Sequence, residues 1–77
     1  GNMQVEVGDM IHWDIPNDPD DYDVGWVVHV ENRASSQGLQ RLVYIRWLFE
    51  DGVDHLWQQT IISNEYIKVT KGGQDDR

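Results

Sequence analysis

Turn-forming residues cut this chain into short runs whose apolar residues alternate with polar ones, and this pattern leaves little room for helices. An alternation with a period of two places one set of side chains on each face of a β-strand. No segment carries the 3.6-residue apolar stripe of an amphipathic helix. The pattern therefore predicts an all-β domain with five strands, at residues 10–15, 24–32, 41–49, 53–59 and 66–69.

The segments between these runs contain the residues that turns prefer. Residues 16–23 hold two prolines, one asparagine and four aspartates, which predicts a long exposed loop. Residues 33–40 predict a polar loop, and Asp51-Gly52 is a strong hairpin signal. Gly25 suits a bend in the second strand, and residues 60–64 suit one short 3₁₀ turn before the last strand.

Aromatic side chains are the main material for a core in a chain of 77 residues. A domain of this size buries only about 60% of the surface of its unfolded chain, and large rings bury the most area per residue. We expect Val43, Ile45 and Trp47 of the third run to face inward; the reverse assignment, with Tyr44, Arg46 and Leu48 inward, is the alternative. Trp13 and Trp26 are the other aromatic residues that we expect in the core.

Charge and cysteine content exclude several classes of protein. The net charge is −8, from 14 acidic and 6 basic residues, and the chain has no cysteine. Disulfides, thiolate metal sites and a cysteine nucleophile are therefore excluded, and the acidic balance disfavours general binding to nucleic acid. No apolar run reaches the length of a membrane span. These features are typical of a soluble, cytoplasmic protein.

Four segments, taken in order, carry a resemblance to a known class of fold. They are Val7-Gly8-Asp9-Met10-Ile11, Val24-Gly25-Trp26-Val27-Val28, Val43-Tyr44-Ile45-Arg46-Trp47 ahead of Asp51-Gly52, and Tyr66-Ile67-Lys68-Val69. This order resembles SH3-like barrels, the Tudor-like small barrels in particular, and uncharacterised short phage and bacterial proteins of that fold. The resemblance implies a single five-stranded barrel over residues 5–70, flexible termini at residues 1–4 and 71–77, and no particular activity.

Aromatic and acidic residues provide the main candidate binding site. Tudor-like domains often bind methylated lysine or arginine in a cage of rings, so the resemblance implies a similar use of exposed rings here. We expect the rings of Tyr22, Tyr44 and Trp57 to be exposed. The acidic loop, with Asp18, Asp20, Asp21 and Asp23, adds attraction for a cationic peptide.

Metal binding and catalysis have weaker support. The loop offers oxygen ligands of the kind that calcium prefers, but its spacing lacks the calcium-loop template, because Asp23 stands where glycine is required. His12, His29 and His55 lie on three different predicted strands without zinc-site spacing. His12 and Asp14 share a strand face, yet no nucleophile or substrate cavity accompanies them. We therefore expect no cofactor, no metal and no enzyme activity.

The sequence favours a non-catalytic protein-interaction module whose partner is a protein or a basic peptide. One alternative is a nucleic-acid-associated barrel, supported by the basic set Arg33, Arg41, Arg46, Lys68 and Lys71. Another is a self-associating structural component, in which exposed Leu48, Phe49 or Trp57 forms the contact. A monomer and a homo-oligomer both remain open.

Overall fold

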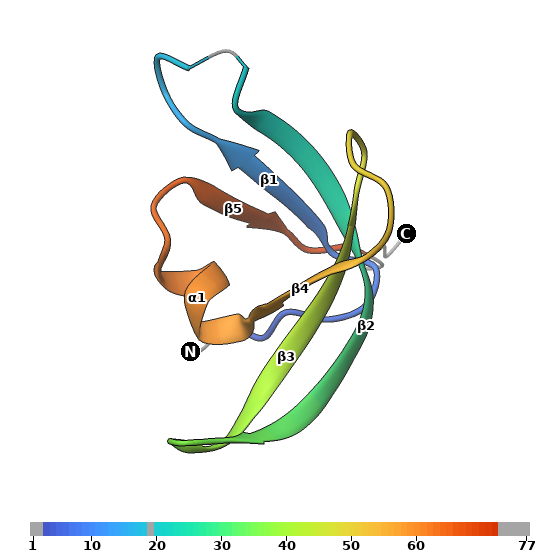
Figure 1. Ribbon diagram of the computed structural model, residues 1–77, viewed down its shortest axis with the longest axis vertical. Coiled ribbons are helices and arrows are strands. Elements are labelled where there is room, and N and C mark those ends of the chain that lie inside the picture. Colours follow the sequence, from blue (N-terminus) through green and yellow to red (C-terminus); the bar gives the residue numbers. More distant parts are fainter. Residues whose placement is uncertain (1–2, 19, 73–77) are drawn as a thin grey trace.

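The computed structural model describes residues 3–18 and 20–72, and most of these residues lie in β-strands. The elements in chain order are β1 (Met10–Asp14), β2 (Tyr22–Ser35), β3 (Gly38–Trp47), β4 (Asp54–Trp57), α1 (Gln58–Ser63) and β5 (Ile67–Thr70). The five strands form one antiparallel sheet in the order β4-β3-β2-β1-β5 (Figure 1). The all-β prediction is confirmed.

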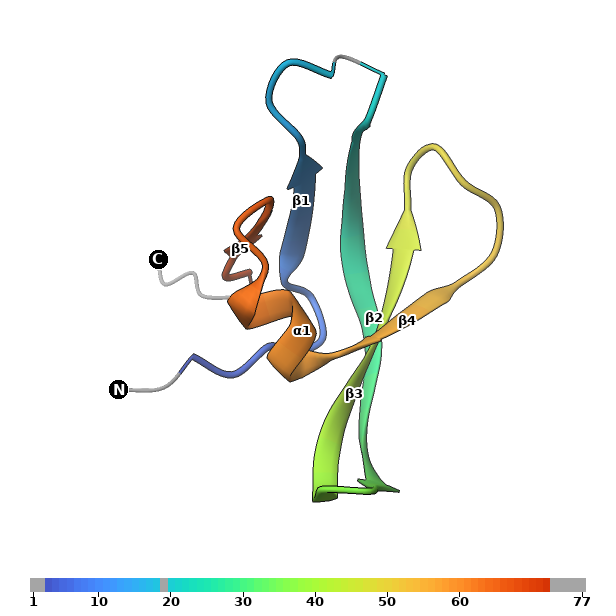
Figure 2. The same ribbon diagram turned by 60° about the vertical axis from the view of Figure 1, so that its left-hand side comes forward.

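The sheet is strongly curved but open. In the described part of the chain β4 and β5 are its two edges and do not pair with each other. The helix α1 packs against β3, β4 and β5, and Figure 2 shows it between the two edges. Its Ile61 is buried in the core, so α1 closes the side of the core that hydrogen bonding between strands leaves open.

The concave face of the sheet holds the core. Residues that lie directly opposite each other on paired strands share a face, and one such row consists of Val69, Ile11, Gly25 and Trp47. A second row contains Val27 and Ile45, and all the apolar members of both rows belong to the core or pack against it. The remaining core residues are Val5, Val43, Ile61 and Ile67, with Trp13, Val30 and Leu56 packed beside them. The inward set Val43, Ile45 and Trp47 is therefore confirmed.

Trp26 is not a core residue, and that prediction is wrong. Its side chain is 39% exposed and lies opposite Met10 and Arg46 on the convex face. Because successive residues of a strand point to opposite faces, β2 can bury either Gly25 and Val27 or Trp26 and Val28. It buries the first pair, since the missing side chain of Gly25 lets β3 approach closely. The register shift of β2 lies between Val27 and His29, beyond the bend expected at Gly25.

The polar loop predicted for residues 33–40 is also wrong. β2 continues to Ser35 and β3 begins at Gly38, so the long hairpin projects beyond the rest of the sheet (Figure 1). The Ser35 hydroxyl accepts a hydrogen bond from the Gln37 amide at 3.1 Å and donates one to the Gly38 carbonyl at 2.9 Å. Gly38 has φ = 100°, the conformation that ends a tight turn of this kind. The hydrogen bonds of Ser35 and the conformation of Gly38 therefore extend the two strands, although their residues here lack an apolar alternation.

The segment after β4 forms an α-helix instead of the predicted 3₁₀ turn. The Asn64 amide donates to the Thr60 carbonyl, four residues earlier, at 3.1 Å, which is the α-helical spacing. The Gln58 side chain accepts a hydrogen bond from the Val5 amide at 2.7 Å, which fixes the start of α1 against the N-terminal segment. The Asp51-Gly52 hairpin is confirmed, with φ = 81° at Gly52.

Both ends of the described chain meet at a buried carboxylate. Asp9 is only 1% exposed. Its side chain accepts hydrogen bonds from the Glu6 amide at 2.9 Å, the Gly72 amide at 3.0 Å and the Lys71 ammonium at 2.6 Å. Lys71 also donates to the Gln4 carbonyl. The packing therefore reaches Gly72, beyond the predicted boundary at residue 70.

The predicted flexible termini fall partly outside the described residues, at positions 1–2 and 73–77. No helix within residues 3–18 and 20–72 is both long and apolar enough to cross a membrane.

Candidate binding groove

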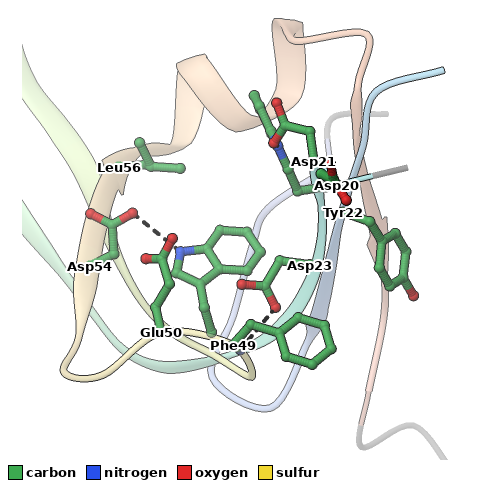
Figure 3. Close-up of a pocket in the computed structure, with 10 residues that line it drawn as sticks. Asp20, Asp21, Tyr22, Asp23, Phe49, Glu50, Asp54 and Leu56 are labelled. Atoms are coloured by element: carbon green, nitrogen blue, oxygen red, sulfur yellow. Dashed lines mark hydrogen bonds between the residues drawn. The ribbon is translucent and has the colours of Figure 1, made fainter. Parts of the chain in front are cut away.

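One open groove lies between the loop that joins β1 to β2 and the loop that joins β3 to β4 (Figure 3). Its volume is about 540 Å³. We call it the acidic groove, and its lining residues are Trp13, Asp20, Asp21, Tyr22, Asp23, Trp47, Phe49, Glu50, Asp54 and Leu56. These residues provide five carboxylates, four aromatic rings and one leucine, and no basic side chain from residues 3–18 or 20–72 joins them.

Two indole groups hold carboxylates at the groove. The Trp47 Nε1–H donates to Asp54 Oδ2 at 3.2 Å, and the Trp13 Nε1–H donates to Asp21 Oδ1 at 2.7 Å. Both tryptophans reach the groove from the ends of core-forming strands, so their rings are fixed by packing. Each hydrogen bond therefore fixes the position of an acidic side chain relative to a ring that is held by the core.

Asp23 is the buried anion of the groove. It is 8% exposed, and its Oδ1 accepts hydrogen bonds from the Val24 amide at 2.7 Å and the Phe49 amide at 3.2 Å. Within residues 3–18 and 20–72, Oδ2 receives no hydrogen bond, and Figure 3 shows this oxygen facing the groove. A buried carboxylate is costly unless a donor or a cation meets it. Asp23 Oδ2 is therefore a point in the groove at which a donor or a cation can bind.

The groove suits an organic cation better than a metal ion. Within residues 3–18 and 20–72, no three histidine or carboxylate side chains converge closely enough to hold a metal. The five carboxylates instead line an open space of about 540 Å³ together with four rings. Aromatic faces attract cations, and carboxylates at their edges can accept hydrogen bonds from the same group. This arrangement can bind an ammonium or guanidinium group.

The structure separates the predicted site residues into three places. Tyr22, Asp20 and Asp21 line the acidic groove. Asp18 lies in a neighbouring hollow, which shares Tyr22 with the groove. Tyr44 and Trp57 lie elsewhere and are only half-buried rather than fully exposed.

Tyr44 is the centre of a row of rings on the convex face of the sheet. It lies opposite His29 on β2 and His55 on β4, with ring centroids 5.2 Å and 5.7 Å away. Its hydroxyl donates to Glu31 at 3.1 Å. Hydrogen bonds from His29, Tyr44 and Arg33, the His29 bond being the largest effect, keep the pKa of Glu31 below its ordinary value. Trp57 lines a smaller hollow nearby, together with Arg33, Leu42 and His55.

Sequence reasoning missed half of the acidic groove. It assigned Trp13 and Trp47 to the core and gave Glu50 and Asp54 no role. The Asp51-Gly52 hairpin was the available signal, because it returns the chain past Trp47 and so brings Asp54 to the indole. Comparison with protein-family models, curated proteins and solved structures found no match for this chain. The chemistry of the groove has to be inferred from its own residues.

Proposed function

We propose that this protein is a non-catalytic interaction module that binds a cationic side chain of a partner protein in the acidic groove. The Oδ2 atom of Asp23 carries the proposal, because it belongs to a largely buried carboxylate, faces the groove and receives no hydrogen bond from the described residues. Four rings line the same groove, and none of the described residues that line it is basic.

We further propose that the sheet is an SH3-like small barrel that is open between β4 and β5. The elements follow the layout of that class along the chain, with α1 at the place of the predicted short turn. β5 returns to pair with β1, and α1 covers the remaining gap. In this arrangement both loops of the acidic groove lie at one end of the barrel.

Removing two groove carboxylates is expected to weaken the binding of a cationic peptide about tenfold, since each lost charge costs about 0.5–1 kcal/mol at a partly exposed site. The variant is Asp20→Asn with Glu50→Gln, two exposed groove residues whose loss should leave the fold intact. The probe is a Ser-Gly peptide that carries two arginines, and amide NMR shifts of the labelled protein give Kd. Parallel peptides with lysine or trimethyl-lysine rank the possible cations.

The matched control is Asp18→Asn with Asp51→Asn. These two residues lie on the same two loops and change the net charge equally, but neither lines the acidic groove. We expect less than a twofold change in Kd for this control. Equal losses in both double variants would mean that only the overall charge matters, and unchanged binding in the groove variant would refute the proposal.

A second candidate function is supported by the convex face of the sheet. Pairing places Arg46 opposite Trp26, Lys68 opposite His12 and Arg33 opposite Gln40 on that face, and Arg33 reaches the Tyr44 hydroxyl at 3.5 Å. Cations interleaved with rings are the features that bind single-stranded nucleic acid. Arg33 is partly neutralised by Glu31, and Arg41 and Lys71 are used elsewhere, on Val5 and Asp9.

This second function predicts that a short single-stranded oligonucleotide shifts the amide signals of Trp26, Arg46 and Lys68. The shifts should fade as the salt concentration rises from about 50 mM to about 200 mM, because phosphate contacts depend on released counterions. The variant Arg46→Ala should remove most of the effect, and Arg41→Ala serves as the comparison. No shifts at low salt would end this candidate.

A further inference from the structure

Two exposed rings flank the buried anion of the acidic groove. Phe49 is 66% exposed and Tyr22 is 46% exposed, although both line the groove. Figure 3 places both on the Asp23 side of the groove, across from Asp54 and Leu56, with Phe49 beside Asp23 and the ring of Tyr22 turned outward. We call Tyr22 and Phe49 the aromatic rim. Leu48 and Val53, on the same loop as Phe49, are also exposed, and neighbouring exposed apolar side chains mark interaction sites.

The loop that carries Phe49 is anchored to the sheet. The Leu48 amide donates to the Val24 carbonyl at 2.8 Å, and the Phe49 amide donates to Asp23. The bond between Trp47 and Asp54 joins the two ends of the loop. Phe49 is thus exposed on an anchored backbone, directly next to the carboxylate that we propose as the cation site. Little ordering of this backbone is needed when a partner binds.

The charges around the aromatic rim decide between two occupants. In a symmetric dimer through this face, a second copy of the chain would bring its own Glu50 and Asp51 against the same residues, with Asp20 and Asp21 close by. Like charges that meet across an interface oppose binding. The rim is therefore suited to a different molecule, whose charge is positive and which also has an apolar side chain to cover the rings.

We propose that the partner segment carries a bulky apolar residue about two positions from its cationic residue, so that the cation enters the groove while the apolar side chain covers the aromatic rim. Side chains two positions apart on an extended segment lie on the same side, roughly 7 Å from each other. Phe49 lines the groove itself, so the two contacts are adjacent. This inference rests on the proposed function, since it adds specificity to the same site.

The test compares three Ser-Gly peptides, with arginine alone, leucine alone, and arginine with leucine two positions later. NMR titration of the labelled protein gives each Kd. We expect the combined peptide to bind about tenfold more tightly than arginine alone, because a large apolar side chain leaves water. In the variant Phe49→Ser this tenfold gain should fall to about one. In the control Leu39→Ser, at an exposed residue on the tip of the projecting hairpin, the gain should be kept.

The outcomes separate this inference from the proposed function. If arginine alone binds and leucine adds nothing, or if the gain survives in Phe49→Ser, the inference is wrong and the cation site stands. If neither arginine peptide binds, both are wrong. If light scattering shows a dimer that Phe49→Ser dissociates, the rim serves a second copy of the chain and the inference is overturned.

Discussion

Replacing Gly25 with alanine is expected to lower the free energy of unfolding by about 3 kcal/mol. A Cβ atom at this position would lie 2.8 Å from the Arg46 carbonyl oxygen, 2.8 Å from Ile45 Cγ2 and 2.9 Å from Trp47 Cε3. A backbone oxygen cannot move aside without shifting β3. A chain of this length has only about 4–12 kcal/mol of stability, so the loss is a large fraction. Urea unfolding followed by tryptophan fluorescence measures it.

Gly8→Ala is the control for this prediction. Gly8 has φ = 97°, and a Cβ atom there would meet nothing within 4 Å. The substitution therefore introduces backbone strain without a clash, and we expect a loss of about 1 kcal/mol. If Gly25→Ala unfolds at the same urea concentration as the unmodified protein, β2 and β3 are not in close contact and the packing described above is incorrect.

The second large effect is expected at Asp9. The variant Asp9→Asn removes the charge that meets Lys71 in a site that is almost fully buried, and it replaces one acceptor oxygen with a donor group. We expect a loss of about 3 kcal/mol, since breaking one side of a buried ion pair leaves its remaining partners unsatisfied. Lys71→Ala should cost less, because the Glu6 and Gly72 amides still meet the carboxylate and the lysine is partly exposed.

The contribution of Asp9 also makes stability depend on pH. Burial raises the pKa of Asp9, but hydrogen bonds from Lys71, Gly72 and Glu6 outweigh it and hold the pKa below its ordinary value of 3.8. The folded protein therefore binds this proton less readily than the unfolded chain. The stabilisation is complete above pH 3.8 and is lost as the pH falls through the lower, folded-state value. Unfolding curves at a series of acid pH values should show the difference between the protein and Asp9→Asn shrinking over that range. A constant difference would contradict the pKa shift.

Much of the sheet could be predicted from the local alternation of apolar and polar residues. Where the prediction is wrong, the structure shows a physical reason. The alternation of Val43, Ile45 and Trp47 predicts the inner face of β3, although the opposite face also carries Leu42 and Tyr44, and Leu42 is only 3% exposed. β2 has apolar residues on both faces, so its pattern does not decide between Trp26 and Val27, and the contact with β3 at Gly25 decides instead. The end of β2 has no apolar pattern, and its strand is extended by the turn at Gly38.

Only one of the two loops that form the acidic groove could be predicted as part of a site. The acidic loop before β2 is visible as a run of aspartates, and Asp20 and Asp21 do line the acidic groove. The opposite wall comes from the loop after β3, and its approach to the first loop depends on the curvature of the whole sheet. Exposure of Phe49 beside a buried Asp23 likewise depends on a hydrogen bond between distant parts of the chain. No sequence pattern in either loop reports this contact.

The pairing of β5 with β1 has a consequence for how the molecule forms. β1 obtains one neighbour from β2 just after it in sequence, but its other edge is completed only by β5, near the end of the described chain. Bringing β5 to β1 closes a long loop, and the entropy of the chain is lost before the new contacts form. Such non-local pairing slows folding. The β2–β3 hairpin, with its two-residue connection, can form first as a local nucleus. One edge of β1 therefore stays unpaired until β5 has formed. During that time β1 can pair with a wrong strand, for example one of another chain.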